Sequence, residues 1–182
     1  MKAALPALAA LLLAACGGRE TLKSDWELRN EARLGRENAD LEVVTRFPAF
    51  PRRENLIEFK VLDSDGFGFF VDRSTLAVGD DGMVRYVLVA RSPSGVENVS
   101  YEGLRCASAE FRRYALGRPD ATWRASASPL QPLARPWHQV LHHEFFCPQN
   151  LPLRTAAEGV QALVEGGHPL FKSFSTESYR AR

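Results

Sequence analysis

The sequence has few of the features that mark several large classes of protein. Its 182 residues carry 23 basic and 22 acidic side chains, so the formal net charge is only +1. A dedicated nucleic-acid-binding domain is basic, and broad adhesion to acidic lipid also needs surplus positive charge, so we expect neither. No phosphate loop, dinucleotide fingerprint or Gly-x-Ser-x-Gly motif occurs, and the three cysteines include no Cys-x-x-Cys pair. The remaining composition suits one globular domain.

No apolar run reaches the roughly 18 residues of a membrane-spanning helix. The longest covers residues 3–15, follows Lys2, and ends in Leu13-Ala14-Ala15-Cys16, which resembles the lipobox of bacterial lipoproteins. We therefore predict a signal peptide over residues 1–15 and a lipid on Cys16 that anchors the mature chain to a membrane. Gly17, in place of an Asp, implies the periplasmic side of the outer membrane. The alternative is an ordinary secretory signal that is cut nearby, with Cys16 incidental.

Charge density divides the mature chain into parts. Residues 19–60 contain 18 charged side chains among 42 positions, whereas residues 61–182 contain 26 among 122. We predict a charged, proline-punctuated tether over residues 16–54, a single α+β domain over 55–167 and a polar tail over 168–182. Within the tether, residues 25–34 could form a short helix that docks through Trp26.

From residue 56 onwards, short apolar runs alternate with turn residues. The pattern predicts strands over residues 57–61, 67–71, 76–78, 83–90, 96–101 and 106–114. Asp80-Asp81-Gly82 is a strong hairpin signal, because glycine accepts a positive φ. The run 83–90 is apolar on both faces, which is typical of a central strand. We therefore expect a five- or six-stranded antiparallel meander.

Helical periodicity replaces this pattern near the C-terminus. A helix is predicted from Pro136 towards Pro148, and a second over residues 153–165, where Val160, Leu163 and Val164 share one face. Strands followed by helices predict an α+β fold, with both C-terminal helices packed on one face of the sheet.

Five segments carry a resemblance to a known family: Phe47-Pro48-Ala49-Phe50-Pro51, Phe69-Phe70-Val71-Asp72, Gly82-Met83-Val84-Arg85-Tyr86, Asn98-Val99-Ser100-Tyr101-Glu102-Gly103-Leu104-Arg105-Cys106 and Tyr114-Ala115. Together they resemble the cryptic neisserial protein family, a group of exported proteobacterial proteins that includes predicted lipoproteins. The resemblance covers roughly residues 47–165. It implies a single periplasmic domain and brings no activity, cofactor or catalytic residues.

Two cysteines remain once Cys16 is assigned to the lipid. An even pair in an oxidising compartment predicts a disulfide between Cys106 and Cys147, closing a loop of about 40 residues. The alternative is two separately buried thiols. Strand alternation would place Cys106 on an unexpectedly polar face with Ser108, Glu110 and Arg112 unless a bulge intervenes.

Two clusters carry potential metal ligands. His138 and His142 are spaced i, i+4 but do not form a His-Glu-x-x-His motif. Aspartates of two predicted turns could meet if both turns lie at one end of the sheet; they are Asp63, Asp65, Asp80 and Asp81. A polar helix face and ordinary turn chemistry explain both patterns, so we predict no metal site and no cofactor.

The family-like segment also holds the candidate binding surface, Tyr101, Glu102 and Arg105, because tyrosine and arginine suit specific recognition. The alternative places Tyr101 in the core and pairs Glu102 with Arg105. We expect a non-catalytic envelope lipoprotein with a protein, glycan or lipid partner and no nucleic acid. The alternative is a small hydrolase-like periplasmic enzyme with its site on the sheet face. A deep pocket that holds a histidine or a carboxylate with a shifted pKa would favour the enzyme.

Overall fold

The computed structural model describes residues 46–62 and 64–172, all of which belong to one compact unit, Ala39–Arg182. The predicted signal peptide, the lipobox with Cys16, the helix over residues 25–34 and the last ten residues lie outside this part. None of the described helices is long and apolar enough to cross a membrane.

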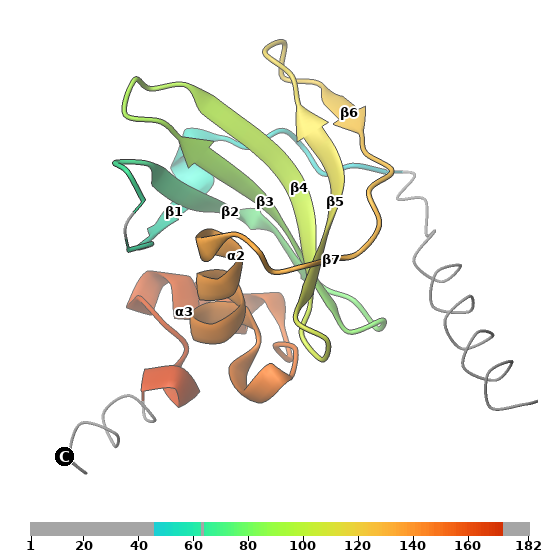
Figure 1. Ribbon diagram of the computed structural model, residues 1–182, viewed down its shortest axis with the longest axis vertical. Coiled ribbons are helices and arrows are strands. Elements are labelled where there is room, and N and C mark those ends of the chain that lie inside the picture. The colour runs from blue at the N-terminus through green and yellow to red at the C-terminus, as the bar shows by residue number, and fades with distance from the viewer. Residues whose placement is uncertain (1–45, 63, 173–182) are drawn as a thin grey trace, which may run out of the picture. The chain divides into compact units, whose positions relative to one another are not determined.

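The core of the fold is an antiparallel sheet in which neighbours in sequence are neighbours in space (Figure 1). Its strands follow one another in the order β1 (Leu56–Phe59), β2 (Gly68–Val78), β3 (Met83–Arg91), β4 (Glu97–Arg105), β5 (Glu110–Gly117) and β6 (Trp123–Ala125). A seventh, two-residue strand, β7 (Gln131–Pro132), also pairs with β5. The predicted antiparallel meander is therefore confirmed.

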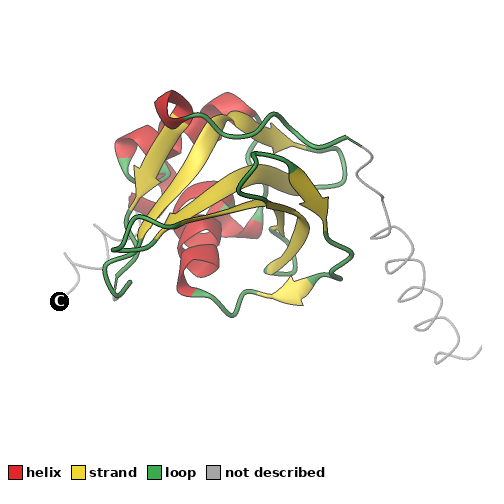
Figure 2. Cartoon of the chain, turned by 90° about the horizontal axis from the view of Figure 1, so that it is seen from above, coloured by secondary structure: helices red, strands yellow, loops and turns green. Residues whose placement is uncertain are grey.

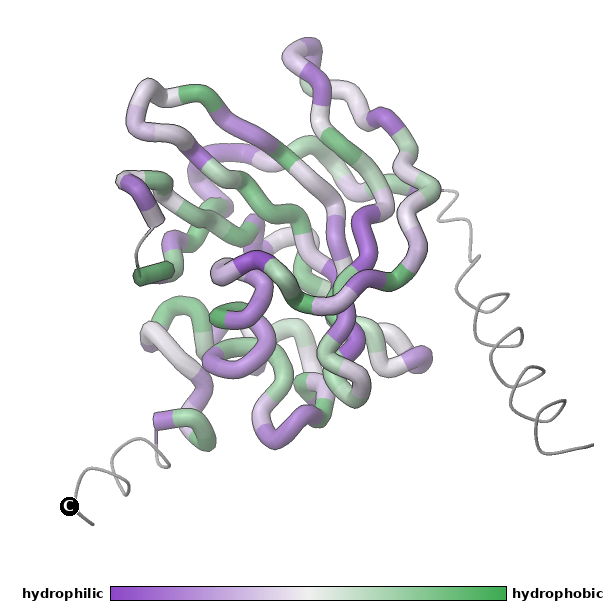
Figure 3. Tube along the Cα trace, in the orientation of Figure 1, coloured by the Kyte–Doolittle hydropathy of each residue, from purple (hydrophilic) through white to green (hydrophobic). Residues whose placement is uncertain are grey.

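Strand β3 is central, as its sequence predicts. It pairs with β4 along its whole length, from Met83 opposite Arg105 to Arg91 opposite Glu97. Alternate side chains bury on opposite faces, so Val84 and Leu88 join one core cluster while Val87 and Val89 join the other. The trace coloured by hydropathy shows apolar stretches along the middle strands (Figure 3).

Strand β2 is one long strand where the sequence predicted two. Its register shifts between Asp72 and Ala77, and side chains there take over backbone hydrogen bonding. The Asp72 carboxylate accepts from the Ser74 amide at 2.9 Å, and the Thr75 hydroxyl accepts from the Val87 amide of β3 at 3.0 Å. The turns before and after β2 therefore lie at its opposite ends. They do not bring Asp65 together with Asp80 and Asp81, and Asp63 lies outside the described residues.

Strand β5 begins later than predicted. Residues 106–109 form a turn between β4 and β5, and Ala109 has a φ of 52°. Cys106 is thus not in register with Ser108, Glu110 and Arg112, which removes the conflict with a polar strand face. Its side chain is buried instead in the core beneath the helices.

The helices gather against one face of the sheet (Figures 1 and 2). Helix α2 (Pro136–Val140) continues into a π-helical turn, η2 (Leu141–Phe146), followed by the 3-10 turn η3 (Pro148–Asn150) and by α3 (Ala156–Glu165). Leu141, Phe146 and Leu163 are buried there against the sheet. Helix α3 begins after the capping residue Thr155 and ends at Gly166, whose φ is 70°. Val164, predicted to share the buried face, is 65% exposed.

The other face of the sheet is covered by residues that precede β1. Phe47 and Phe50 pack beside the ring of Trp123, with ring centroids 6.4 and 5.2 Å away, and the Trp123 indole donates to the Pro48 carbonyl at 2.8 Å. A 3-10 turn, η1 (Arg53–Asn55), leads from this segment into β1. The packed part of the chain thus begins before residue 55, the predicted start of the domain. It also extends past residue 167, because the His168 amide donates to the Glu144 carbonyl at 2.7 Å.

Candidate functional site

A buried polar cluster lies between the sheet and α2. Its centre is Glu102 of β4, whose side chain points to the helix-covered face. One carboxylate oxygen accepts from the Ser100 hydroxyl at 2.8 Å and lies 3.4 Å from Nε of Arg113 on β5. The other oxygen lies 2.8 Å from Nε2 of His138 on α2. Strand alternation places Ser100 and Glu102 on one face, and the register places Tyr86 of β3 directly opposite Glu102.

The surroundings of this cluster shift the pKa of two of its groups. Burial raises the pKa of Glu102, but hydrogen bonds and charge from His138, with help from Ser100 and Arg113, outweigh burial and hold that pKa below its usual value. The pKa of Tyr86 lies well above its usual value because the phenol is buried and because the negative charge of Glu102 is near. Glu102 therefore stays ionised while Tyr86 stays neutral.

The Glu102–His138 pair at the centre of the cluster is sealed from solvent, whereas the Arg113 side chain is 36% exposed. Glu102 is 1% exposed and His138 is fully buried, with its ring 3.9 Å from that of Phe111. Its order also differs from that of a nucleophilic triad, in which the histidine stands between a hydroxyl and a carboxylate. Here the carboxylate stands between Ser100 and His138, so no hydroxyl is activated. The arrangement can join strands to helix, but a substrate cannot reach it.

The second predicted histidine has separate partners. Nε2 of His142 lies 3.0 Å from the Cys106 carbonyl, and burial lowers the pKa of this imidazole. His138 faces Glu102 instead, so the two rings do not converge on one point. Within residues 46–62 and 64–172, no group of three or more His, Cys, Asp or Glu side chains is placed to hold a metal ion. Asp81, one of the predicted acidic turn residues, forms a salt bridge with Arg85.

A pocket of about 500 Å³ beside α2 holds His143 and Glu144, and burial raises the pKa of the Glu144 carboxyl. Two further open pockets have more apolar than polar lining, one at the start of α2 and one on the face away from the helices. The first, here called the aromatic pocket, has a volume of about 460 Å³ and lies between the loop after β1 and the start of α2. Trp137 stacks on Phe69 there with ring centroids 5.0 Å apart, and Phe67 also stacks on Phe69 with centroids 6.4 Å apart. Ser64, Asp65 and Asn98 supply its polar groups.

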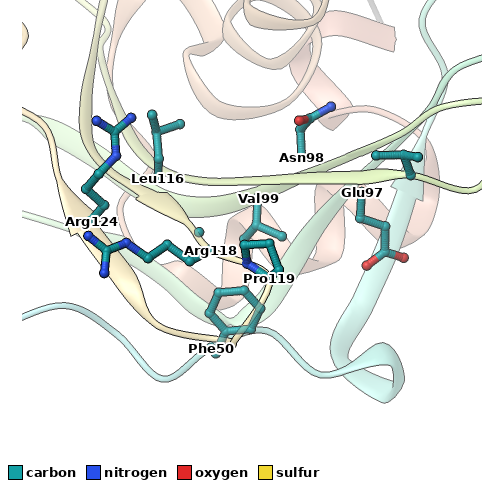
Figure 4. A pocket seen from close by; sticks show the side chains of 10 residues that line it. Phe50, Glu97, Asn98, Val99, Leu116, Arg118, Pro119 and Arg124 are labelled. Atoms are coloured by element: carbon teal, nitrogen blue, oxygen red, sulfur yellow. The ribbon is translucent and has the colours of Figure 1, made fainter.

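The second, here called the arginine pocket, has a volume of about 640 Å³ (Figure 4). It lies where β4 and β5 separate, beyond their last pair, Ser100 and Leu116. Two arginines, Arg118 and Arg124, come from either side of the hairpin turn between β5 and β6.

The comparison with family models places these features in one family. Residues 36–164 match the model of the CNP1-like family. The chain belongs to the CNP1-like family. Neither the curated proteins nor the solved structures contain a match. The region matched in this CNP1-like chain includes the Glu102 cluster and both arginines of the arginine pocket. No activity comes with membership of the family.

The three residues of the predicted binding surface do not converge in the CNP1-like fold. Tyr101 is buried on the face away from the helices, with its ring 5.3 Å from that of Tyr114. Glu102 lies on the helix-covered face, and its arginine partner is Arg113. Arg105 is half-buried at the end of β4, and alternation places it on the same face as Tyr101. Glu102 and Arg105 therefore point to opposite sides of the sheet.

Sequence reasoning missed Ser100, Arg113 and His138 as the partners of Glu102. One signal was present in the sequence. Ser100 and Glu102 alternate with the apolar Leu104 on a single face of β4, and polar groups on a buried face need partners. The identity of those partners depends on α2, which lies 36 residues further along the chain.

Proposed function

We propose that this CNP1-like protein is an exported lipoprotein that binds a ligand and does not catalyse a reaction. Lipid on Cys16 holds it at the periplasmic side of the outer membrane. The aromatic pocket is its binding site, and it takes the apolar ring or chain of a lipid, glycan or protein partner. The observation that carries the proposal is that the Glu102–His138 pair is buried, whereas the aromatic pocket is open and lined mainly by aromatic and apolar side chains.

The burial of the acid–base pair argues against the enzyme alternative. A general acid or base must come within hydrogen-bond reach of the group whose proton it transfers. Glu102 and His138 have the arrangement of such a pair, yet α2 covers them completely. The aromatic pocket brings together Asp65, Ser64 and Asn98, but no histidine and no nucleophile with a base beside it.

The form of the aromatic pocket supports ligand binding. A volume of about 460 Å³ lies within the range of small-molecule sites, which are lined mainly by apolar and aromatic side chains with a few polar groups. Phe67 remains 36% exposed at its edge, and the neighbouring Leu62 is 85% exposed. Large apolar side chains exposed beside a pocket favour association with an apolar partner.

The lipid anchor can be tested by labelling cells with palmitate. Cys16→Ala should abolish incorporation of the label and release the protein from the membrane, because the acylated thiol is gone. Gly17→Asp is the matched variant: it keeps the thiol and should keep the label while moving the protein away from the outer membrane. Label that persists in Cys16→Ala would refute the anchor.

The binding site can be tested with the uncharged fluorescent probe N-phenyl-1-naphthylamine and the full mature chain. Its fluorescence should rise on binding, and Phe67→Ser should weaken binding about tenfold because one wall of stacked rings is lost. Leu151→Ser, which changes an exposed apolar residue that does not line the pocket, is the control. Equal affinities in the unchanged chain and Phe67→Ser would refute the site.

A further inference from the structure

The arginine pocket has a different chemistry from the aromatic pocket and is separate from the Glu102 cluster. Its apolar lining comes from Phe50, Val99, Leu116 and Pro119. Both guanidinium groups, of Arg118 and Arg124, lie at the same end of the pocket (Figure 4). We propose that this pocket binds an oxyanion, phosphate or carboxylate, that is attached to an apolar group.

The positive charge of the pocket comes from two arginines, Arg118 and Arg124, that are not held in salt bridges within the described part of the chain. The carboxylate that lines the pocket, Glu97, is already engaged by Arg91, with nitrogen–oxygen distances of 2.8 and 2.9 Å. Two positive charges therefore remain for an incoming anion.

A second carboxylate, that of Asp120, is hydrogen-bonded within the hairpin turn. Asp120 stands in the turn between Arg118 and Arg124, but its carboxylate accepts from the Thr122 amide at 3.1 Å and from the Thr122 hydroxyl at 2.6 Å. These hydrogen bonds shape the hairpin turn, as short polar side chains commonly do. Asp120 thus fixes the position of the turn. Its negative charge also acts on Arg118, without a salt bridge between the two side chains.

The backbone that carries the two arginines is held in place. The Arg118 amide donates to the Thr122 carbonyl at 2.9 Å, and β6 pairs with β5 from Ala125 to Trp123. The Trp123 indole in turn donates to the Pro48 carbonyl, which positions Phe50 as a wall of the pocket. Arginines on a fixed hairpin lose less conformational freedom on binding than arginines on a mobile loop.

The combination of groups defines the ligand class. A guanidinium presents a planar fork of donors that matches the oxygens of phosphate or carboxylate. Burial of an alkyl chain or a ring against the apolar wall beside it adds favourable binding free energy. A free inorganic anion has no such apolar group. A volume of about 640 Å³ accommodates both parts of such a molecule.

Calorimetric titration of the full mature chain with octyl phosphate, below its micelle concentration, tests the proposal. Octyl glucoside supplies the same chain without the anion, and inorganic phosphate supplies the anion without the chain. We expect octyl phosphate to bind at least tenfold more tightly than either. Equal affinity for octyl glucoside would overturn the role of the arginines, and equal affinity for inorganic phosphate would overturn the role of the apolar wall.

Substitutions of the two pocket arginines test whether octyl phosphate binds in this pocket. Arg118→Gln and Arg124→Gln should each weaken octyl phosphate binding about tenfold, with the melting temperature unchanged because both side chains are exposed. Arg73→Gln removes the same charge from an exposed residue outside the pocket and should leave the affinity unaltered. Phe67→Ser should also leave it unaltered, which separates this proposal from the aromatic pocket. Octyl phosphate affinity that is unchanged in both pocket variants would overturn the assignment.

Discussion

Glu102 shows how a single residue can connect two layers of the fold. Its carboxylate receives hydrogen bonds from its own strand, from β5 and from α2. A buried carboxylate is costly unless donors compensate for its lost hydration. These donors hold the pKa of Glu102 below its usual value although burial alone would raise it. The sequence indicated the segment around Glu102, but it could not separate a surface role from this internal one.

Removal of the Glu102 carboxylate should destabilise the domain strongly. We expect Glu102→Ala to lower the free energy of unfolding by about 3–5 kcal/mol, because Arg113 and His138 would lose their buried partner. Urea unfolding followed by circular dichroism measures this change. Glu54→Ala, at an exposed position in η1, is the control and should change stability by less than about 0.5 kcal/mol. A loss in Glu102→Ala that is no larger than in the control would contradict the structural role.

The stabilising effect of Glu102 should depend on pH. Its pKa in the folded protein is lower than the value of about 4.3 for an unfolded chain, so folding favours the ionised form. The contribution is therefore complete above the unfolded pKa and is lost as the pH falls through the folded pKa. The stability difference between the unchanged chain and Glu102→Gln should be constant from pH 7 to about pH 5 and should shrink below about pH 4. A difference that grows on acidification would show that the sign is wrong.

Among the elements, the disulfide joins the turn after β4 to the end of η2. Cys106 and Cys147 are 41 residues apart in sequence, and both are buried in the helix-side core. The double variant Cys106→Ser, Cys147→Ser should lose about 2–5 kcal/mol of stability, because the unfolded chain regains the freedom of a long loop. The midpoint of urea unfolding, compared between the variant and the oxidised unchanged chain, measures the effect. An unchanged midpoint would mean that the crosslink adds nothing to helix docking.

Elements with a strong local pattern could be predicted, and elements that depend on distant contacts could not. The apolar alternation of residues 83–90 and the Gly166 end of α3 identify β3 and α3 without further information. The polar run from Asp72 to Thr75 looked like a turn. It remains part of β2 because its side chains bond to the backbone, including the Val87 amide of the neighbouring strand. Strands β6 and β7 are too short to give a pattern of their own.

For the whole molecule, the sheet has two buried faces but helices on only one. The opposite face is closed by aromatic residues from both ends of the meander, with Phe47 and Phe50 before β1 and Trp123 in β6. High charge and frequent proline made residues 46–54 resemble a tether in the sequence. Their role depends on three aromatic rings that meet across more than 70 residues of chain. Phe50, one of these rings, also forms a wall of the arginine pocket.

Truncation tests whether the segment before β1 belongs to the folded unit. A chain that starts at residue 46 keeps Phe47 and Phe50, whereas a chain that starts at residue 54 lacks them and exposes the apolar face around Trp123 and Val99. Partial burial of two phenylalanines and one indole hydrogen bond should contribute about 2–4 kcal/mol. The shorter chain should therefore unfold at a lower urea concentration, and the emission of Trp123 should shift to longer wavelength before unfolding begins. In the longer chain, Phe50→Ala should reproduce part of the loss, because Phe50 is the closer of the two rings to Trp123. Identical unfolding of the two truncated chains would mean that this segment is a tether that merely lies on the sheet.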